Sequence, residues 1–250
     1  MKKKIKLIRG AALVVVIIGM VFIVLQINNW VAISDTFSLQ AIEVNGNRLI
    51  KTEDILGQFN LENGVNVTNL NLAKIQQSIE KHPYVKAALV SRRLPSSLQI
   101  DVIERKPVAY ISQSGKPLSA TDKEGTLLPL GTGILLGSLP VITGIEDLPN
   151  DIGELIKSDR VTKAIDLLMS NQKISTAYYQ SFSEVHYDPK IGYVLYFNDG
   201  RFPVLFGREN FSKKAEKNFI FINKIKSENR YNKLSYVDLR FEDQVVANFN

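Results

Sequence analysis

The spacing of hydrophobic residues changes period several times between residues 37 and 105. A short β-prone run ends at the turn signal Asn45-Gly46, and two stretches with helical spacing follow at about 52–59 and 72–79. His82-Pro83 closes the second stretch, because the residue before a proline is pushed out of the α region. These features predict one strand followed by two helices, the first of them with Thr52 as its N-cap.

Two strand-like runs complete this region. Residues 85–90 form the first run, and apolar side chains alternate along the second at Leu98, Ile100 and Val102, after a break at 92–95. The order β-α-α-β-β in about 70 residues predicts a small module in which two helices cover one face of a three-stranded sheet. The residues expected in its core include Ile42, Val44, Val85, Leu98 and Ile100.

Beyond residue 107 the pattern is mostly that of strands. A turn at 122–125 lies between two short apolar runs and predicts a hairpin, and amphipathic helices are expected at 159–173 and 210–225. Further strands are expected at 108–112, 182–187, 192–197, 202–206, 236–241 and 245–249. The predicted fold class is therefore α+β, with a mostly antiparallel β domain and two helices after the small module.

The N-terminal region has no charged side chain between Arg9 and Asp35. This uncharged run is long enough for the roughly 20 residues that cross a bilayer core, and Trp30 falls where an indole suits the interface. We expect an uncleaved transmembrane helix at 11–30 and a linker at 31–36. A cleaved signal peptide has the same order of basic and apolar segments, but its apolar run is shorter and ends in small residues. A buried core helix fits poorly, because the segment is apolar on all sides.

The positive charge of the chain is concentrated at its start. Of the 31 basic residues, five lie in the first nine positions, which leaves 26 against 25 acidic residues in the rest of the chain. A nearly neutral body argues against nucleic-acid binding, which usually needs a basic face. A basic tail at 1–10 stays in the cytoplasm, so the residues after the membrane helix are expected to be exported.

Residues for catalysis are scarce. The chain has no cysteine and two histidines, His82 and His186, and it lacks the G-x-S-x-G and S-x-x-K motifs of serine nucleophiles and any phosphate-binding loop. We therefore assign no catalytic, metal or cofactor residue, no cofactor and no small-molecule substrate. A tethered cell-wall hydrolase or transpeptidase would need the nucleophile or metal ligands that are missing.

Three motifs occur in order along the first module: IEVNGN at 42–47, HPYV at 82–85, and the stretch from Ala88 to Ala109 that contains LP and ERKPVA. In these motifs the chain resembles the POTRA module of the bacterial division protein family FtsQ, called DivIB in some lineages. The resemblance continues more thinly through LPVITG, FNDGRFPVLFGRENFSKKAEK and YVDLRFEDQVVANF. It implies a POTRA domain at 37–107 and a β-rich domain at 108–250.

The same resemblance implies a function. Members of this family are non-enzymatic scaffolds of the division machinery at the septum, anchored once in the inner (cytoplasmic) membrane, and they join the bitopic proteins FtsB and FtsL. An ectodomain without catalytic residues suits this role, because an exposed sheet edge can pair with a partner strand. A POTRA-containing chaperone or secretion component is the alternative, but it usually carries tandem POTRA modules and a barrel, which the remaining length does not accommodate.

The last strand is the expected partner-binding edge. Phe241, Val246 and Phe249 would serve as apolar anchors there, and Arg208 and Arg240 could hold a partner carboxylate. The resemblance places the family's partner site at Arg208, Arg240 and Phe241. Arg240 could instead pair with the neighbouring Asp238, and Phe241 could belong to the core. The chain departs from its relatives after Phe241, where Glu242, Asp243 and Gln244 replace a small Ser-Gly pair, and at Phe249, where a larger aromatic residue is expected.

Overall fold

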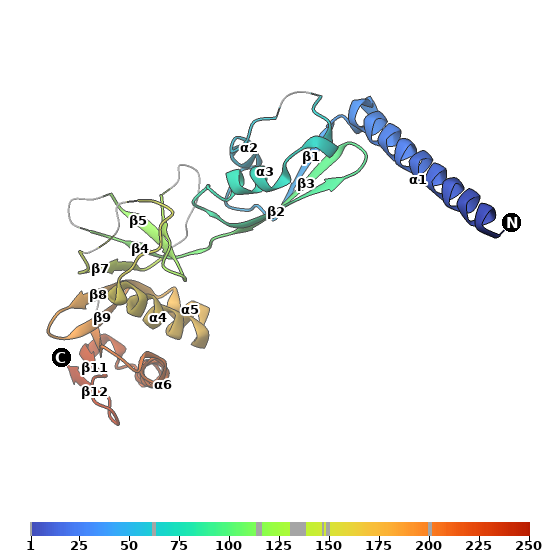
Figure 1. Cartoon of the computed structure of the whole chain (residues 1–250). Coiled ribbons are helices and arrows are strands. Elements are labelled where there is room, and N and C mark those ends of the chain that lie inside the picture. The colour runs from blue at the N-terminus through green and yellow to red at the C-terminus, as the bar shows by residue number, and fades with distance from the viewer. Residues whose placement is uncertain are drawn as a thin grey trace. The chain divides into compact units, whose positions relative to one another are not determined.

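The computed structural model describes residues 2–61, 64–113, 117–130, 139–146, 148, 151–199 and 202–250, with side chains from residue 13 onward. The chain divides into two compact units, residues 1–104 and 105–250 (Figure 1). The predicted fold class is confirmed, since one apolar N-terminal helix precedes a small α/β module and a large, mostly antiparallel sheet with helices.

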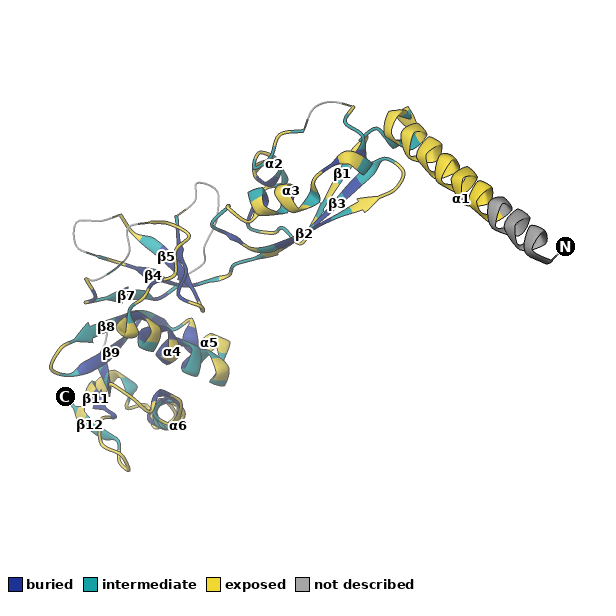
Figure 2. Cartoon of the chain, in the orientation of Figure 1, coloured by how far each residue is buried: buried dark blue, intermediate teal, exposed yellow. Residues whose placement is uncertain are grey.

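The first helix, α1 (Lys2–Ile33), is longer than predicted. It begins within the basic tail, whose side chains lie outside the described residues, and it continues into the segment expected to be a linker. Its stretch Leu13–Ile33 has a mean hydropathy of 2.2 and none of it is buried (Figure 2). Its 21 residues span roughly 31 Å at about 1.5 Å per residue, which matches a bilayer core of about 30 Å. One apolar helix of this length suits a single-pass anchor.

The rest of the first unit is a three-stranded sheet with two helices, in the order predicted. Its strands are β1 (Ala41–Asn45), β2 (Val85–Arg93) and β3 (Ser97–Glu104), and its helices are α2 (Thr52–Leu56), α3 (Leu72–Ile79) and the 3-10 turns η1 (Asp35–Phe37) and η2 (Val67–Asn69). Within the described residues β3 lies in the centre, parallel to β1 and antiparallel to β2. Leu98 and Ile100 are fully buried between sheet and helices, as predicted.

Two features of the sequence motifs hold this module together. Gly46 has a φ of +85°, and a Cβ at this position would lie 2.1 Å from the carbonyl oxygen of Val102, so the turn after β1 requires glycine. The carboxylate of Glu104 accepts hydrogen bonds from the backbone N–H groups of Arg48, Leu49 and Ile50 at 2.8 to 3.0 Å. One acidic side chain thus satisfies three backbone donors and ties the end of β3 to the segment before α2.

The second unit is a sheet of nine strands with helices. Its strands are β4 (Pro107–Ile111), β5 (Ser119–Asp122), β6 (Leu127–Leu128), β7 (Val141–Thr143), β8 (Phe182–Asp188), β9 (Gly192–Phe197), β10 (Pro203–Gly207), β11 (Leu234–Asp238) and β12 (Val246–Phe249). Its helices are α4 (Asp159–Ile174), α5 (Thr176–Tyr179), α6 (Phe211–Ser227) and the 3-10 turn η3 (Tyr231–Lys233). The strand order in the described residues is β12-β11-β10-β9-β8-β7-β4-β5-β6.

The core of the second unit lies between this sheet and its helices (Figure 2). Helices α4 and α6 bury one stripe each, including Val161 and Leu168 on α4 and Ala215 and Ile222 on α6, because apolar residues recur every three or four positions. The aromatic rings of Tyr178 and Phe182 meet edge to face at 4.8 Å inside this core. The sheet and its helices thus leave β12 and β6 as the two terminal strands.

Candidate functional site

Strand β12 pairs with β11 on one side only, within the described residues. The backbone N–H of Asn250 donates to the carbonyl of Lys233, just before β11. Because successive N–H groups of a strand point to opposite sides, those of Ala247 and Phe249 point away from β11. No described residue is bonded to them, so β12 offers unpaired backbone donors and acceptors to another strand.

The opposite edge of the same sheet is covered by the chain itself. The N–H of Leu127 in β6 donates to the carbonyl of Glu154, and the N–H of Gly153 donates to the carbonyl of Leu127. A further bridge joins Thr126 to Leu155. The segment 153–156 therefore occupies the backbone groups that β6 would otherwise offer to a partner.

The edges of the first unit are also partly occupied. On β2 the outward N–H of Ala88 donates to the carboxylate of Glu80 at 3.2 Å, so a strand added there would have to displace that side chain. On the other edge, the chain that leads into β1 is bonded to the segment before η2 through Leu39 and Val65. Of these four edges, β12 is the one that ends beside exposed cationic and aromatic side chains.

Arg240 lies just after β11 and forms an ion pair with Asp238, which the sequence analysis gave as the alternative to a partner contact. Its Nη2 lies 2.6 Å from Oδ2 and its Nε lies 3.0 Å from Oδ1 of the buried Asp238, whose Oδ1 also accepts the backbone N–H of Arg240. Burial raises the pKa of the Asp238 carboxyl, but the hydrogen bonds from Arg240 outweigh it and the pKa lies below its usual value. The Arg240 side chain remains 42% exposed, so it can meet a partner while paired.

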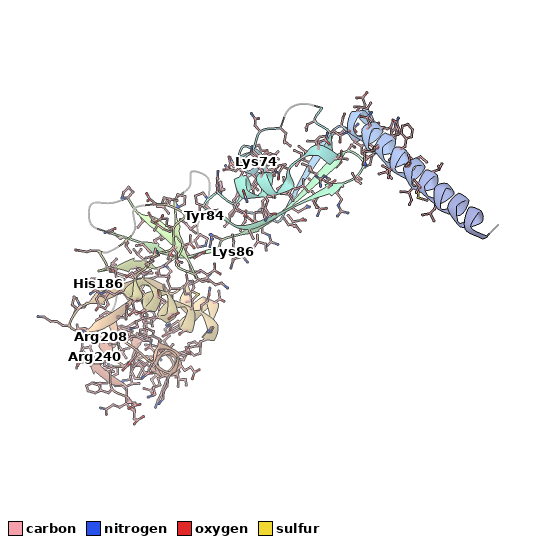
Figure 3. All side chains as sticks on the ribbon, in the orientation of Figure 1. Lys74, Tyr84, Lys86, His186, Arg208 and Arg240 are labelled. Atoms are coloured by element: carbon pink, nitrogen blue, oxygen red, sulfur yellow. The ribbon has the colours of Figure 1, made fainter. Side chains whose placement is uncertain are left out.

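Arg208 lies next to Arg240, because β10 and β11 run parallel and their ends meet (Figure 3). Between the two arginines lies Gly207, with a φ of +75°; a Cβ there would lie 3.2 Å from Cγ of Arg240. Arg208 is exposed, and its Nη2 donates to the carbonyl of Pro189 in the turn after β8. The fold therefore brings the two predicted arginines together on one corner of the sheet.

The three predicted apolar anchors do not form one patch. Phe241 is 49% exposed in the loop after Arg240, and Val246 lies opposite Asp238 at the same end of the sheet edge. Phe249 lies opposite Leu234 at the other end, packs partly buried on the core and is covered by the Arg230 guanidinium at 4.2 Å. Phe241 and Val246 are thus beside the arginines, whereas Phe249 belongs largely to the core.

Sequence reasoning assigned no role to three lysines at the start of α6. Lys213, Lys214 and Lys217 line a groove of about 250 Å³ together with Glu209, Asn210, Arg240 and Glu242, called the α6 groove below. Their spacing places them on one side of the helix start. The run of lysines is visible in the sequence. The spacing of hydrophobic residues, however, does not predict that the loop before β12 folds against the start of α6.

The side chains of Thr143, His186 and Glu184 lie together as in a catalytic triad, but they do not have the geometry of one. The Oγ1 of Thr143 lies 2.8 Å from Nδ1 of His186 and is hydrogen-bonded to the Glu184 carboxylate. In a nucleophile–base–acid relay the acid holds the second ring nitrogen, but here Glu184 lies 3.7 Å from Nδ1, the nitrogen that already faces the hydroxyl. His82, the other histidine, accepts the N–H of Tyr84 through Nδ1 and has a structural role.

Comparison with known proteins covers both units. A family model described as POTRA domain, FtsQ-type, matches residues 37–105, and one described as FtsQ/DivIB, C-terminal related, matches residues 106–248. Cell division protein FtsQ of Geotalea daltonii is 28% identical over 250 residues, 99% of this chain and 87% of that protein. Cell division protein FtsQ of Syntrophotalea carbinolica is 27% identical over 224 residues, 86% of this chain and 74% of that protein. Cell division protein DivIB of Clostridium acetobutylicum is 34% identical over 123 residues, 49% of each chain.

The two matches follow each other along the chain as the sequence motifs predicted, with the POTRA module first and the C-terminal region after it. Since the second model alone matches more than half of the chain, the chain belongs to the FtsQ/DivIB family, whose members named above are cell division proteins.

Proposed function

We propose that this protein is a non-enzymatic scaffold of the bacterial division machinery. It crosses the cytoplasmic membrane once through α1, with its N-terminus inside and both folded units outside. At the division septum it recruits and regulates small bitopic partners of the FtsB and FtsL type. The family membership and the single apolar helix support the setting of this proposal.

The open edge of β12 is the observation that carries the proposal. A partner strand placed there can bond to the outward backbone groups of Ala247 and Phe249, and such bonds give affinity without any catalytic residue. The exposed ring of Phe241 and the guanidinium groups of Arg208 and Arg240 would then select the partner. Partner binding at Arg208, Arg240, Phe241 and Val246 is part of this proposal, and Phe249 contributes its backbone more than its ring.

A proline at position 247 tests strand addition in intact cells. Ala247→Pro removes the outward N–H and puts the proline ring where a partner strand would pair, while edge strands tolerate proline on their open side. With a photo-crosslinking residue in place of the exposed Asn248, the full-length protein should capture an FtsB-like partner. Ala247→Pro should lower that capture about tenfold or more. A loss of about 1.4 kcal/mol of binding free energy already lowers the binding constant tenfold.

The control is Ala247→Ser, which alters the side chain and keeps the N–H donor. It should capture the partner as the unchanged protein does. Equal capture by the proline variant, with folding verified by urea unfolding, would remove β12 as the binding edge. A fluorescent fusion of the full chain that stays evenly distributed around the envelope, without gathering at midcell, would contradict the role in division.

A further inference from the structure

The end of α1 is joined directly to the POTRA module. The last carbonyl groups of a helix have no partner within the helix. Here Nδ2 of Asn66, the residue before η2, donates to the carbonyls of Val31 and Ala32 at 2.8 and 3.1 Å. The ring of Trp30 also meets the ring of Phe37, in η1, edge to face at 6.2 Å. The apolar helix therefore enters the module through fixed contacts.

These contacts set the height of η2 relative to a bilayer. Val31 and Ala32 follow Trp30 by one and two residues, which is about 1.5 and 3 Å along the helix. Trp30 suits the interface between acyl chains and headgroups, and the headgroup layer is about 5–8 Å thick on each side of the apolar core. Since Asn66 is bonded to the helix at this height, η2 begins within the headgroup layer.

The turn between β2 and β3, residues 93–96, lies at the same end of the sheet. Strand β3 runs parallel to β1 with Ser97 opposite Ala41, so both strands begin at the end where the chain arrives from α1. The backbone N–H of Gln40, just before β1, donates to the carbonyl of Ser96 at 2.8 Å. The β2–β3 turn is therefore at the membrane end of the POTRA sheet.

Arg92 fixes this turn on η2. Its Nε donates to the carbonyl of Val67 at 2.7 Å, and its Nη2 donates to the carbonyls of Leu70 at 2.7 Å and Thr68 at 3.3 Å. The same η2 segment is bonded to the end of α1 through Asn66. A chain of side-chain hydrogen bonds thus holds the β2–β3 turn beside the point where α1 ends.

The turn presents an apolar side chain next to cations. Leu94 is 64% exposed, and its neighbours Arg93 and Pro95 are exposed as well. Single exposed leucines are ordinary on protein surfaces, so Leu94 matters only through its place. That place is the membrane end of the sheet, directly after Arg92 and Arg93. Apolar side chains flanked by basic ones are typical of segments that lie in a membrane interface.

The charge at this end of the module is positive. Neither Arg92 nor Arg93 forms an ion pair within the described residues, and the guanidinium of Arg93 is bonded to the neutral side chain of Gln99 at 2.5 Å. In the segments 34–40, 65–71 and 91–97, all of which the structure describes, Asp35 is the one acidic residue. Arginine is well suited to lipid phosphates, because its planar group can donate two parallel hydrogen bonds.

We infer that the β2–β3 turn rests in the headgroup layer of the outer leaflet of the membrane that α1 crosses, with Leu94 at the acyl boundary and Arg93 on lipid phosphates. This inference rests on the single-pass anchor of the proposed function. One helix alone leaves a folded domain free to tilt about its end. A second contact at the turn restricts that tilt and fixes which edges of the POTRA sheet face away from the membrane.

A fluorescent probe at position 94 tests the membrane contact. The chain has no cysteine, so Leu94→Cys carries a single environment-sensitive fluorophore. The full chain is placed in nanodiscs of phosphatidylcholine and phosphatidylglycerol, with or without lipids that carry a nitroxide quencher on the headgroup. The quencher should lower the emission at position 94 about threefold or more, because the turn lies within the headgroup layer.

The matched control is Ile103→Cys with the same fluorophore. Ile103 is 61% exposed and lies near the other end of β3, six residues or about 20 Å from Ser97, which is beyond the headgroup layer. Its emission should fall by less than about a fifth, since the quencher cannot reach it. Equal quenching at both positions, or none at position 94, would overturn the inference.

Charge reversal tests the role of Arg93. With the probe at position 94, Arg93→Glu should reduce the quenching about twofold in nanodiscs that contain phosphatidylglycerol, and about 500 mM salt should reduce it similarly in the unchanged sequence. Lys51→Glu makes the same charge change on an exposed residue after β1, at the opposite end of the sheet, and should leave the quenching unchanged. Equal effects of the two reversals would refute phosphate binding by Arg93.

Two further outcomes separate the inference from the function on which it rests. A chain that stays in the nanodisc and captures an FtsB-like partner, but is not quenched at position 94, rejects the inference and keeps the proposed function. A change at position 94 that appears only when the exported segment of that partner is added would assign the turn to a protein contact and reject the lipid. Extraction of the full chain from membranes by alkaline carbonate would reject the anchor itself.

Discussion

Asp238 and Arg240 show at the scale of single residues how one side chain serves structure and recognition together. The buried carboxylate of Asp238 is satisfied almost entirely by Arg240. Removing or reversing Arg240 therefore leaves a buried carboxylate without its partner, and such groups cost about 1–3 kcal/mol. Loss of partner binding by an Arg240 variant consequently mixes two effects, whereas Ala247→Pro removes an outward backbone N–H and leaves the Asp238–Arg240 pair in place.

The Asp238 carboxyl should make the stability of the second unit depend on acid. The pKa of this carboxyl in the folded protein lies below its value of about 3.9 in the unfolded chain. The ionised Asp238 therefore stabilises the fold at pH values above about 3.9. This stabilisation is lost as the pH falls through the lower pKa of the folded protein. We expect Asp238→Asn to lower the free energy of unfolding by about 1–2 kcal/mol at pH 7 and to flatten its decline below about pH 4. Urea unfolding of the full chain in micelles between pH 7 and pH 2 measures both.

Asp243→Asn is the control for this pH dependence, because Asp243 is an exposed acid in the loop that follows. It should leave the free energy of unfolding within about 0.5 kcal/mol at every pH. Parallel acid profiles for Asp238→Asn and the unchanged protein would show that the Arg240 pair contributes nothing to stability.

Glu104 is a second residue with a structural charge. Its carboxylate accepts the N–H groups of three consecutive residues, so Glu104→Ala leaves these donors without their acceptor. We expect the POTRA domain to lose about 2–3 kcal/mol of its free energy of unfolding, measured by urea unfolding of the full chain. Glu43→Ala on β1, an exposed acid in the same sheet, should cost less than about 0.5 kcal/mol, and a similar loss for both would refute this role.

Neither of these residue-level contacts could be predicted in full from the sequence. The partners of Glu104 lie 54 to 56 positions away, and hydrophobic periodicity carries no information on such pairs. The predicted N-cap Thr52 was wrong by one position, since Lys51 precedes the helix and Thr52 Oγ1 instead accepts Nδ2 of Asn47. The Asp238–Arg240 pair was foreseen as an alternative because the two residues are neighbours in the sequence.

At the scale of elements, amphipathic helices were predicted well and short parallel strands were not. The helices expected at 159–173 and 210–225 are α4 and α6, because their apolar stripes are long and regular. Strand β7 has three residues and pairs in parallel with β4 and β8, so its central place depends on contacts distant in sequence. The strand expected at 236–241 ends at Asp238, which frees Arg240 and Phe241 for the loop beside the α6 groove.

The turn after β1 provides a test at this scale. Gly46 and Gly64 both have positive φ angles, +85° and +77°, but a Cβ would meet the Val102 carbonyl at 2.1 Å only at Gly46. Gly64→Ala should therefore cost about 1 kcal/mol of backbone strain, whereas Gly46→Ala should cost about 3 kcal/mol or more, because the chain must also move away from β3. Urea unfolding of the two variants compares them, and equal losses would show that the close approach at Gly46 is not needed.

At the scale of the whole molecule, the described residues combine one apolar helix that could span a membrane with two sheet-containing units, and the sheet of the second unit has at one edge a strand, β12, that is paired on one side only. The self-covered edge at β6 and the side-chain bond of Glu80 on β2 contrast with the open backbone of β12. Proteins usually protect exposed edges, because unpaired strands invite association. Under the proposed function, a partner strand completes the sheet at this open edge.

Amide hydrogen exchange of the full chain, with and without the exported segment of the FtsB-like partner, measures strand addition at β12 most directly. In the free protein the N–H of Asn250, bonded to Lys233, should exchange slowly, whereas those of Ala247 and Phe249 should exchange fast. Partner binding should slow exchange at Ala247 and Phe249 by about tenfold or more, as new backbone hydrogen bonds do. Unchanged exchange at these two amides in the bound complex, or new protection confined to β2 of the POTRA domain, would contradict binding at the C-terminal edge.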